Sequence, residues 1–199
     1  MRAPDLQHLI DATSNAFAAR IKHGTRLAEL SDHIFNAAAH DFAVPTANAT
    51  PETLPVCRHL KPALLTAASG SQETAAVAGA FSKIASRLIW RRRIPGKNDQ
   101  EGFADNHANA LLIGTGGLEQ RDDIQIGASL VSPAIVYPDH THPPEEMYVV
   151  LSSGEWRNAE TDWHTPGIGG TVHNPPGIVH AMRANNDAPL FAIWCLRSP

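Results

Sequence analysis

The chain has 199 residues, 43% of them hydrophobic and 18% charged, with a formal net charge of -4 at pH 7. This composition does not suggest disorder, and the weak negative charge favours neither nucleic acid nor an anionic membrane surface as a partner. No apolar run approaches the roughly 18 residues of a membrane span, and the polar N-terminal stretch does not resemble a signal peptide. We therefore expect a cytoplasmic protein whose two cysteines, Cys57 and Cys195, are free thiols.

The first part of the chain is predicted to be helical. Apolar residues follow a helical stripe over residues 6–17 and again over residues 26–40. A polar, proline-rich connector is expected over 44–55, and a further, alanine-rich helix over 71–88. We expect the whole segment 1–88 to pack on the domain that follows it, because its apolar stripes need a partner surface.

Short β-type runs separated by Gly, Pro, Asn and Asp make up the second part of the chain, residues 89–199. The candidate strands are 110–113, 124–137, 146–152, 170–172 and 189–196. Many short strands with close turn signals are typical of a sandwich or barrel. The sequence therefore predicts a mainly β domain over 89–199, preceded by an α-helical segment.

The residues that carry chemistry begin at His140. His140 and His142 are two positions apart, so on a strand their side chains share one face. Glu146 and Tyr148 share a face in the same way after a Pro-Pro turn. Two imidazoles and a carboxylate from adjacent strands suit a divalent ion such as Fe²⁺, Mn²⁺, Zn²⁺ or Ni²⁺. A further ligand must come from elsewhere in the chain, and His180, after a second Pro-Pro sequence, is the candidate.

Together these residues resemble the two signature motifs of the cupin superfamily. The pattern H-x-H-x-x-x-E, followed by G-x5-P-x-G-x-x-H, is matched at His140, His142, Glu146, Gly169, Pro175, Gly177 and His180. The resemblance implies a cupin β-barrel (a double-stranded β-helix) that holds one metal ion with His140, His142, Glu146 and His180. Three positions depart from the pattern. Ala134 replaces a glycine, Gly154 closes the first motif one residue late, and Ala184 replaces an asparagine.

Three aromatic residues are candidates for the pocket around the metal. Tyr148 lies two residues after Glu146 and is expected to point into the barrel beside the metal. Tyr137 precedes the histidine pair, and Trp194 lies on the last predicted strand. Tyr148 and Trp194 are also compatible with an ordinary role in the core, and Tyr137 can reach the barrel mouth if Pro138 shifts the phase of the strand. His107 is expected at the surface or between helices, and no spacing recommends His164 or His173 as ligands.

The tyrosines extend the resemblance to one cupin branch, the dimethylsulfoniopropionate (DMSP) lyases, in particular those of the DddQ kind. These small bacterial proteins have a helical part before the barrel and a motif similar to H-x-H-x-x-x-E-x-Y, with a tyrosine upstream. The resemblance implies cleavage of the C–S bond of DMSP by β-elimination, which gives dimethyl sulfide and acrylate. Tyr148 is then the expected base, with Tyr137 as competitor, and Tyr137, Trp194 and His140 are expected to contact the substrate.

Other functions remain open from the sequence. A non-haem metal dioxygenase or an isomerase would use the same ligands, and a sensory or sugar-binding cupin would hold a metal without catalysis. The identity of the ion (Fe²⁺, Zn²⁺ or Mn²⁺) is also open, because His/Glu sites accept several. A monomer and a homodimer are both compatible with the sequence.

Overall fold

The computed structural model describes residues 2–40, 44–45, 50–94, 96 and 99–198. Its α-helices are α1 (Pro4–Ala18), α2 (Arg26–Ala39), α3 (Leu60–Ala68) and α4 (Gln72–Ile84), and its 3-10 helices are η1 (Pro55–His59), η2 (Ala85–Arg87) and η3 (Phe103–Asp105). The strands are β1 (Val44–Pro45), β2 (Trp90–Arg91), β3 (His107–Ile113), β4 (Glu119–Gln120), β5 (Ile124–Val131), β6 (Val136–His140), β7 (Glu145–Val150), β8 (Glu155–Asn158), β9 (Thr161–His164), β10 (Thr171–Asn174), β11 (His180–Arg183) and β12 (Leu190–Arg197).

The helices follow the predicted stripes, with one addition. The stripes over 6–17 and 26–40 form α1 and α2, and the alanine-rich segment forms α4. The hydroxyls of Thr25 and Ser71 cap α2 and α4 by accepting from backbone N–H groups three residues on. Helix α3 was not predicted; its Pro62 lies in the first turn, where a missing N–H costs no hydrogen bond. Residues 46–49 of the predicted connector lie outside the described part of the chain.

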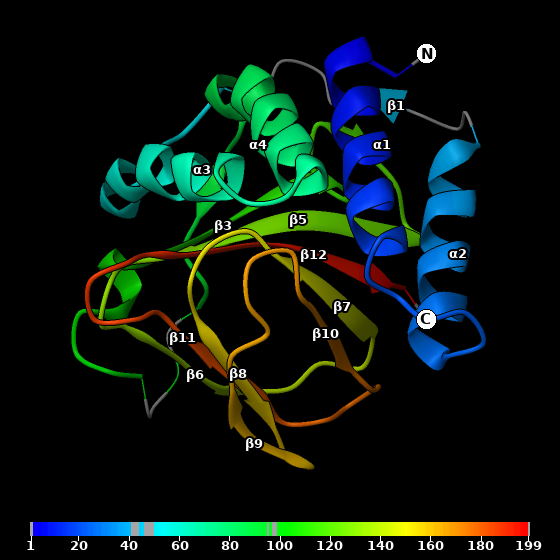
Figure 1. Ribbon diagram of the computed structural model, residues 1–199. Coiled ribbons are helices and arrows are strands. Elements are labelled where there is room, and N and C mark those ends of the chain that lie inside the picture. Colours follow the sequence, from blue (N-terminus) through cyan, green and yellow to red (C-terminus); the bar gives the residue numbers. More distant parts are fainter. Residues whose placement is uncertain (1, 41–43, 46–49, 95, 97–98, 199) are drawn as a thin grey trace.

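Two sheets face each other and form the barrel. The larger has the order β1-β4-β3-β5-β12-β7-β10, with β2 paired to β3, and the smaller has the order β6-β11-β8-β9. The helices lie on one face of the larger sheet, and the smaller sheet lies on its other side (Figure 1). This is the cupin β-barrel with a helical N-terminal segment, so the predicted fold class is confirmed. None of the described helices has the length and apolarity needed to cross a membrane.

The predicted strand over 124–137 is wrong in one respect, because it is two strands in different sheets. The chain leaves the larger sheet after β5, turns, and enters the smaller sheet as β6. Ala134 lies in that turn at a φ of 62°, and it is the one non-glycine residue with a positive φ in the described part of the chain. Its N–H donates to the carbonyl of Asn185 at 2.8 Å. A left-handed backbone explains why the cupin motif places a glycine here.

Two clusters of apolar side chains lie on opposite faces of the larger sheet. One joins the helices to the sheet, and in it the ring of Phe81 on α4 meets that of Phe191 on β12 edge to face at 5.0 Å. The other fills the barrel and includes Tyr148 and Val150. Strand β7 alternates between them as expected for a strand, because Met147 and Val149 face the helices. That the two parts of the chain divide at 88/89 stays a prediction.

A buried carboxylate ties α2 to the barrel. Glu145 is 5% exposed and accepts hydrogen bonds from Arg26 Nε at 2.9 Å and from His173 Nε2 at 2.8 Å. Burial raises the pKa of Glu145, but the hydrogen bonds from Arg26 and His173 outweigh it and hold the pKa below its ordinary 4.5. His173 therefore has a partner on the outer side of β7.

This cluster predicts a pH-dependent contribution to stability. Arg26→Met removes the guanidinium, and we expect the melting temperature to fall at about pH 7, where Glu145 is ionised. A carboxyl with a depressed folded-state pKa stabilises the protein above its unfolded pKa and loses that effect as pH falls through its folded pKa. The gap between variant and wild type should therefore narrow towards about pH 4 in thermal melts.

Arg92→Met is the matched control, because Arg92 pairs with the exposed Asp105. We expect this variant to melt close to the wild type at both pH values, since exposed ion pairs contribute little. If the difference in melting temperature between Arg26→Met and the wild type stays constant with pH, the charge of Arg26 contributes nothing to stability. Arg26 would then stabilise the protein only through packing of its aliphatic part.

Candidate metal centre

Three histidines converge inside the barrel, each with its ring held by the backbone. His140 ends β6, His142 lies in the loop before β7, and His180 begins β11, directly across from His140 in the register of the two strands. Each Nδ1 lies within 2.9–3.0 Å of a backbone carbonyl two residues away. A carbonyl only accepts hydrogen bonds, so Nδ1 carries the proton and Nε2 keeps its lone pair.

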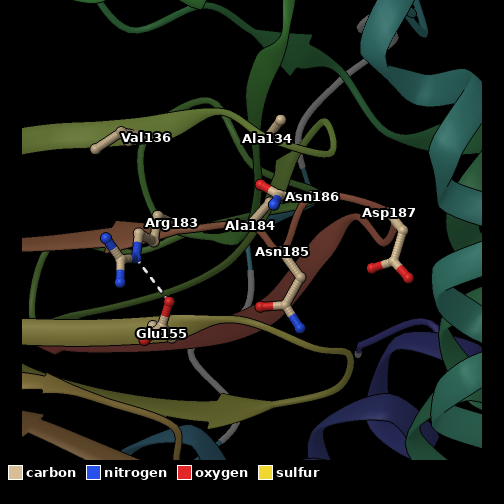
Figure 2. Close-up of a pocket in the computed structure, with 8 residues that line it drawn as sticks. All are labelled: Ala134, Val136, Glu155, Arg183, Ala184, Asn185, Asn186 and Asp187. Carbon is tan, nitrogen blue, oxygen red and sulfur yellow. Dashed lines mark hydrogen bonds and ion pairs between the residues drawn. The ribbon is translucent and has the colours of Figure 1, made fainter.

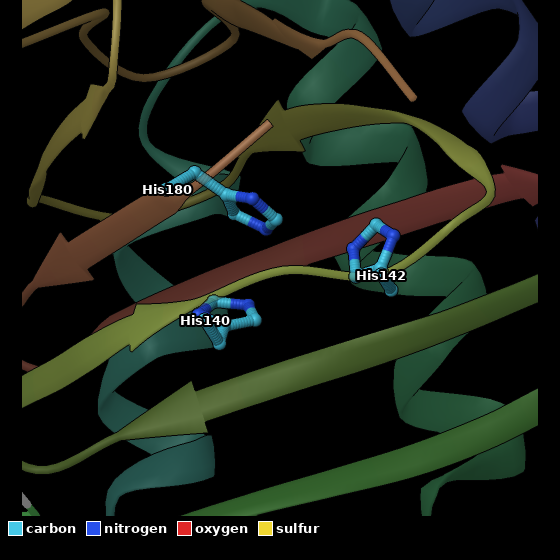
Figure 3. Close-up of side chains that lie close together, drawn as sticks. All are labelled: His140, His142 and His180. Carbon is cyan, nitrogen blue, oxygen red and sulfur yellow. The ribbon is translucent and has the colours of Figure 1, made fainter. Parts of the chain in front are cut away.

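The three rings point toward one another (Figure 3). Their nearest ligand atoms all lie within 4.8 Å of one another, and the ring centroids of His140 and His180 are 4.1 Å apart. The Nε2 atoms of His142 and His180 are buried and have no hydrogen-bond partner. Buried polar atoms are normally satisfied, so two unsatisfied lone pairs aimed at one point fit a divalent metal ion.

Glu146 adds a carboxylate to the histidines. It begins the inward face of β7 and is 4% exposed. Its Oε2 lies 3.4 Å from His142 Nε2 and 3.2 Å from His180 Nε2. The structure thus gathers all four sequence-predicted ligands in one place, although His180 follows Glu146 by more than thirty residues in the chain. That each of them binds the ion stays a prediction.

The electrostatics of Glu146 and His140 favour the protonation states that a metal needs, whereas for His142 the lowering of the pKa by burial is outweighed by Glu146, which raises it. Burial raises the pKa of Glu146, but His142 and His180 outweigh it and hold the pKa at about 2. Burial, together with the neighbouring His180, lowers the pKa of His140 to about 4. At neutral pH the site therefore offers an ionised carboxylate and a neutral imidazole, the forms that bind metals.

Two of the predicted aromatic residues lie side by side on the inner face of the larger sheet. Tyr148 of β7 is opposite Trp194 of β12, and Trp194 is opposite Gly127 of β5. A Cβ at Gly127 would lie 2.2 Å from Cζ2 of Trp194, so only glycine leaves room for the indole. Burial and the charge of Glu146 raise the pKa of Tyr148 well above its ordinary value.

Tyr137 belongs to β6 of the smaller sheet and lies in an aromatic enclosure. Its ring is 4.5 Å from that of His140 and 4.7 Å from that of His107, centroid to centroid. The guanidinium of Arg93 lies over the ring of Tyr137 at 5.4 Å. Burial raises the pKa of Tyr137 to about 12, although Arg93 and Asn109 act in the opposite direction.

The sequence-based placement of His107 at the surface or between helices is wrong. The side chain is fully buried, stacks on Phe103 at 4.7 Å, and has no hydrogen-bond partner at either ring nitrogen. Burial lowers its pKa to about 4. The predicted strand began at residue 110. Strand β3 in fact begins at His107. A predicted strand with this start would have placed His107 and Asn109 on one face, because they are two positions apart. His164 is exposed and takes no part.

Trp156 is a second residue of the barrel interior that the sequence did not suggest. It belongs to β8, a strand that was not predicted, and its ring lies 6.4 Å from that of Tyr148. It is 2% exposed, and its Nε1 has no hydrogen-bond partner. An indole N–H that is buried and unpaired is available to a polar ligand inside the barrel.

A separate cavity of about 740 Å³ lies at the turns next to β6 and β11 (Figure 2). It is lined by Ala134, Val136, Glu155, Arg183, Ala184, Asn185, Asn186 and Asp187. The one cation among these residues, Arg183, is paired with Glu155 at 2.7 Å. None of the predicted site residues lines this cavity, so it is not the candidate centre.

The fold and the convergent side chains define a cupin with a candidate metal centre. The family model for dimethylsulfoniopropionate lyase matches residues 28–192. The chain therefore belongs to the DMSP lyase family, as its motifs predict.

Solved and curated relatives agree with this assignment. The crystal structure of the DMSP lyase DddQ from Ruegeria pomeroyi superposes with a TM-score of 0.75 at 25% identity, over 98% of this chain and 92% of that one. In sequence, DddQ of Ruegeria pomeroyi is 34% identical over 124 residues, which are 60% of this chain and 59% of DddQ. A putative DMSP lyase, DddL of Cereibacter sphaeroides, is 26% identical over 147 residues, 72% of this chain and 60% of DddL. The matched regions thus span about three fifths of these curated relatives.

Proposed function

We propose that this protein is a metal-dependent DMSP lyase. Membership of the family supports the proposal, and the two tyrosines beside the histidine cluster are the structural observation that carries it. The reaction is a β-elimination. A base takes the α-proton, the electron pair forms the C=C bond of acrylate, and the C–S bond breaks. Dimethyl sulfide leaves as a neutral molecule and needs no proton.

His140, His142, Glu146 and His180 would hold one divalent ion, with Fe²⁺, Zn²⁺ and Mn²⁺ as the candidates. When bound, such an ion supplies positive charge. That charge would bind the carboxylate of the substrate and stabilise the negative charge that develops on this carboxylate as the α-proton leaves. It would also stabilise a nearby phenolate. His140 is the ligand that could instead contact substrate, because His142 and His180 pair with Glu146 and His140 does not.

Tyr148 is the proposed base, and its Oη takes the α-proton. It stands two residues from Glu146 on the same face of β7, so it lies beside the ligand cluster. Tyr137, on β6 of the smaller sheet and next to His140, is the competing candidate. Both phenols have raised pKa values in the protein alone, because both are buried. Either one therefore needs nearby positive charge to act as a base at neutral pH.

Trp194 is the proposed surface for the sulfonium group. Its indole lies next to Tyr148 and is only partly buried, so one part of the ring is open to a ligand. Tyr137 is less suited to this role, because Arg93 already lies over its ring. A cation over an aromatic face contributes on the order of 0.5–2 kcal/mol.

The test is to incubate purified protein with DMSP after loading with Fe²⁺, Zn²⁺ or Mn²⁺ and to measure dimethyl sulfide in the headspace by gas chromatography. We expect release of dimethyl sulfide together with an equal amount of acrylate. Absence of both products with every metal would refute the lyase. Oxygen uptake with a thiol or catechol substrate would favour a dioxygenase instead.

A further inference from the structure

The carboxylate of Glu146 has a hydrogen-bond donor that lies outside the four ligand positions. Asn174 Nδ2 donates to Glu146 Oε2 at 3.1 Å. Oε2 is the same oxygen that faces His142 and His180. Asn174 is 1% exposed, so this hydrogen bond is formed out of contact with water.

The fold fixes Asn174 as firmly as it fixes Glu146. The two residues are direct partners in the antiparallel pairing of β10 and β7. The turn after Asn174 closes back on the first motif, because Gly177 N donates to the carbonyl of His142 at 3.0 Å and the hydroxyl of Thr141 donates to the carbonyl of Gly177 at 2.7 Å. The amide therefore has a fixed position relative to the loop that carries His142.

A glutamate needs such a partner if its carboxylate is to keep one orientation. The last torsion of a glutamate side chain is broad, so the carboxylate plane is not set by the side chain alone. A donor at a fixed position selects one oxygen and one plane. An amide does this without carrying charge, so it neither protonates the carboxylate nor repels it.

We propose that Asn174 is a positioning residue of the metal centre, which holds the Glu146 carboxylate in the orientation that faces His142 and His180. The inference rests on the metal centre of the proposed function. Residues that orient a metal ligand from behind typically change metal affinity by about 10–100-fold when they are replaced. Asn174 acts through Glu146, so its effect disappears when Glu146 is absent.

The experiment measures Zn²⁺ affinity by competition with a chelator, in the absence of DMSP. Asn174→Leu keeps the volume and removes the donor, and we expect it to weaken Zn²⁺ binding by about 10–100-fold. In the Glu146→Ala background, titrated at Zn²⁺ concentrations that still load the three histidines, the same change should weaken binding no further. Val172→Ala is the matched control, because Val172 faces the barrel from the same strand but pairs with Tyr148. It should bind Zn²⁺ like the wild type.

Unchanged affinity in Asn174→Leu would overturn the inference, and so would an equal loss in the Glu146→Ala background. If Asn174→Leu does not fold, as judged by circular dichroism, Asn174→Ala takes its place in the same comparison. A wild-type protein that does not bind Zn²⁺ would overturn the inference together with the metal centre. One that binds Zn²⁺ with the expected pattern but releases no dimethyl sulfide would support the inference and refute the lyase.

Discussion

His142→Ala and His180→Ala are each expected to deplete the protein of metal and to abolish release of dimethyl sulfide. The two rings come from opposite motifs, and their buried Nε2 atoms have no other partner. Removing either leaves the ion with an incomplete set of ligands. The loss of affinity should be at least the roughly 10–100-fold that supporting residues alone produce. Metal content by mass spectrometry of the purified variants is the direct measurement.

Glu146→Ala should behave in the same way, because Oε2 faces both rings. His164→Ala is the control, since this histidine is exposed and belongs to the same barrel. It should keep its metal and its activity. Full metal content and activity in either His142→Ala or His180→Ala would mean that the centre is wrongly assigned.

Tyr148→Phe is expected to lower kcat by about 10²-fold or more while most of the metal stays bound. The change keeps the ring against Trp156 and Trp194 and removes only the hydroxyl that would take the α-proton. Steady-state rates of dimethyl sulfide release and metal content should be measured on the same samples. Loss of metal along with activity would assign Tyr148 a role as a ligand.

Tyr137→Phe provides the comparison. Its ring would keep the contacts with Phe103, His107 and His140. We expect the smaller loss of kcat here if Tyr148 is the base. If Tyr148→Phe stays near wild-type kcat while Tyr137→Phe is inactive, the roles are reversed. If neither variant loses activity, the base is a group other than these two phenols.

The alternation of side chains along single strands was predictable from the sequence. The period of two placed Glu146 and Tyr148 on one face of β7, and the structure has both inside the barrel. The spacing of the second motif also predicted that His180 lies close to His140 and His142, although strand β11 itself was not predicted. Four-residue strands such as β8, β9 and β11 are too short for alternation to stand out from loop residues.

Contacts across strands were not predictable, because they depend on register. Asn174 meets Glu146 only because β10 pairs with β7 in one particular alignment, and a shift by one residue would turn it outward. The same holds for His173, which the alternation of β10 sends to Glu145 on the outer face. The periodicity of a single strand does not predict which other strand it pairs with.

The left-handed backbone at Ala134 affects the unfolded chain as well as the folded one. For a residue with a Cβ this conformation costs roughly 1–2 kcal/mol. Glycine would remove that cost, but it would also give the denatured ensemble more conformations to lose, a penalty of about 0.4–1 kcal/mol. The two effects partly cancel, so the net cost of the alanine is about 0–1.6 kcal/mol. The turn that sends the chain from one sheet to the other therefore tolerates the loss of its family glycine.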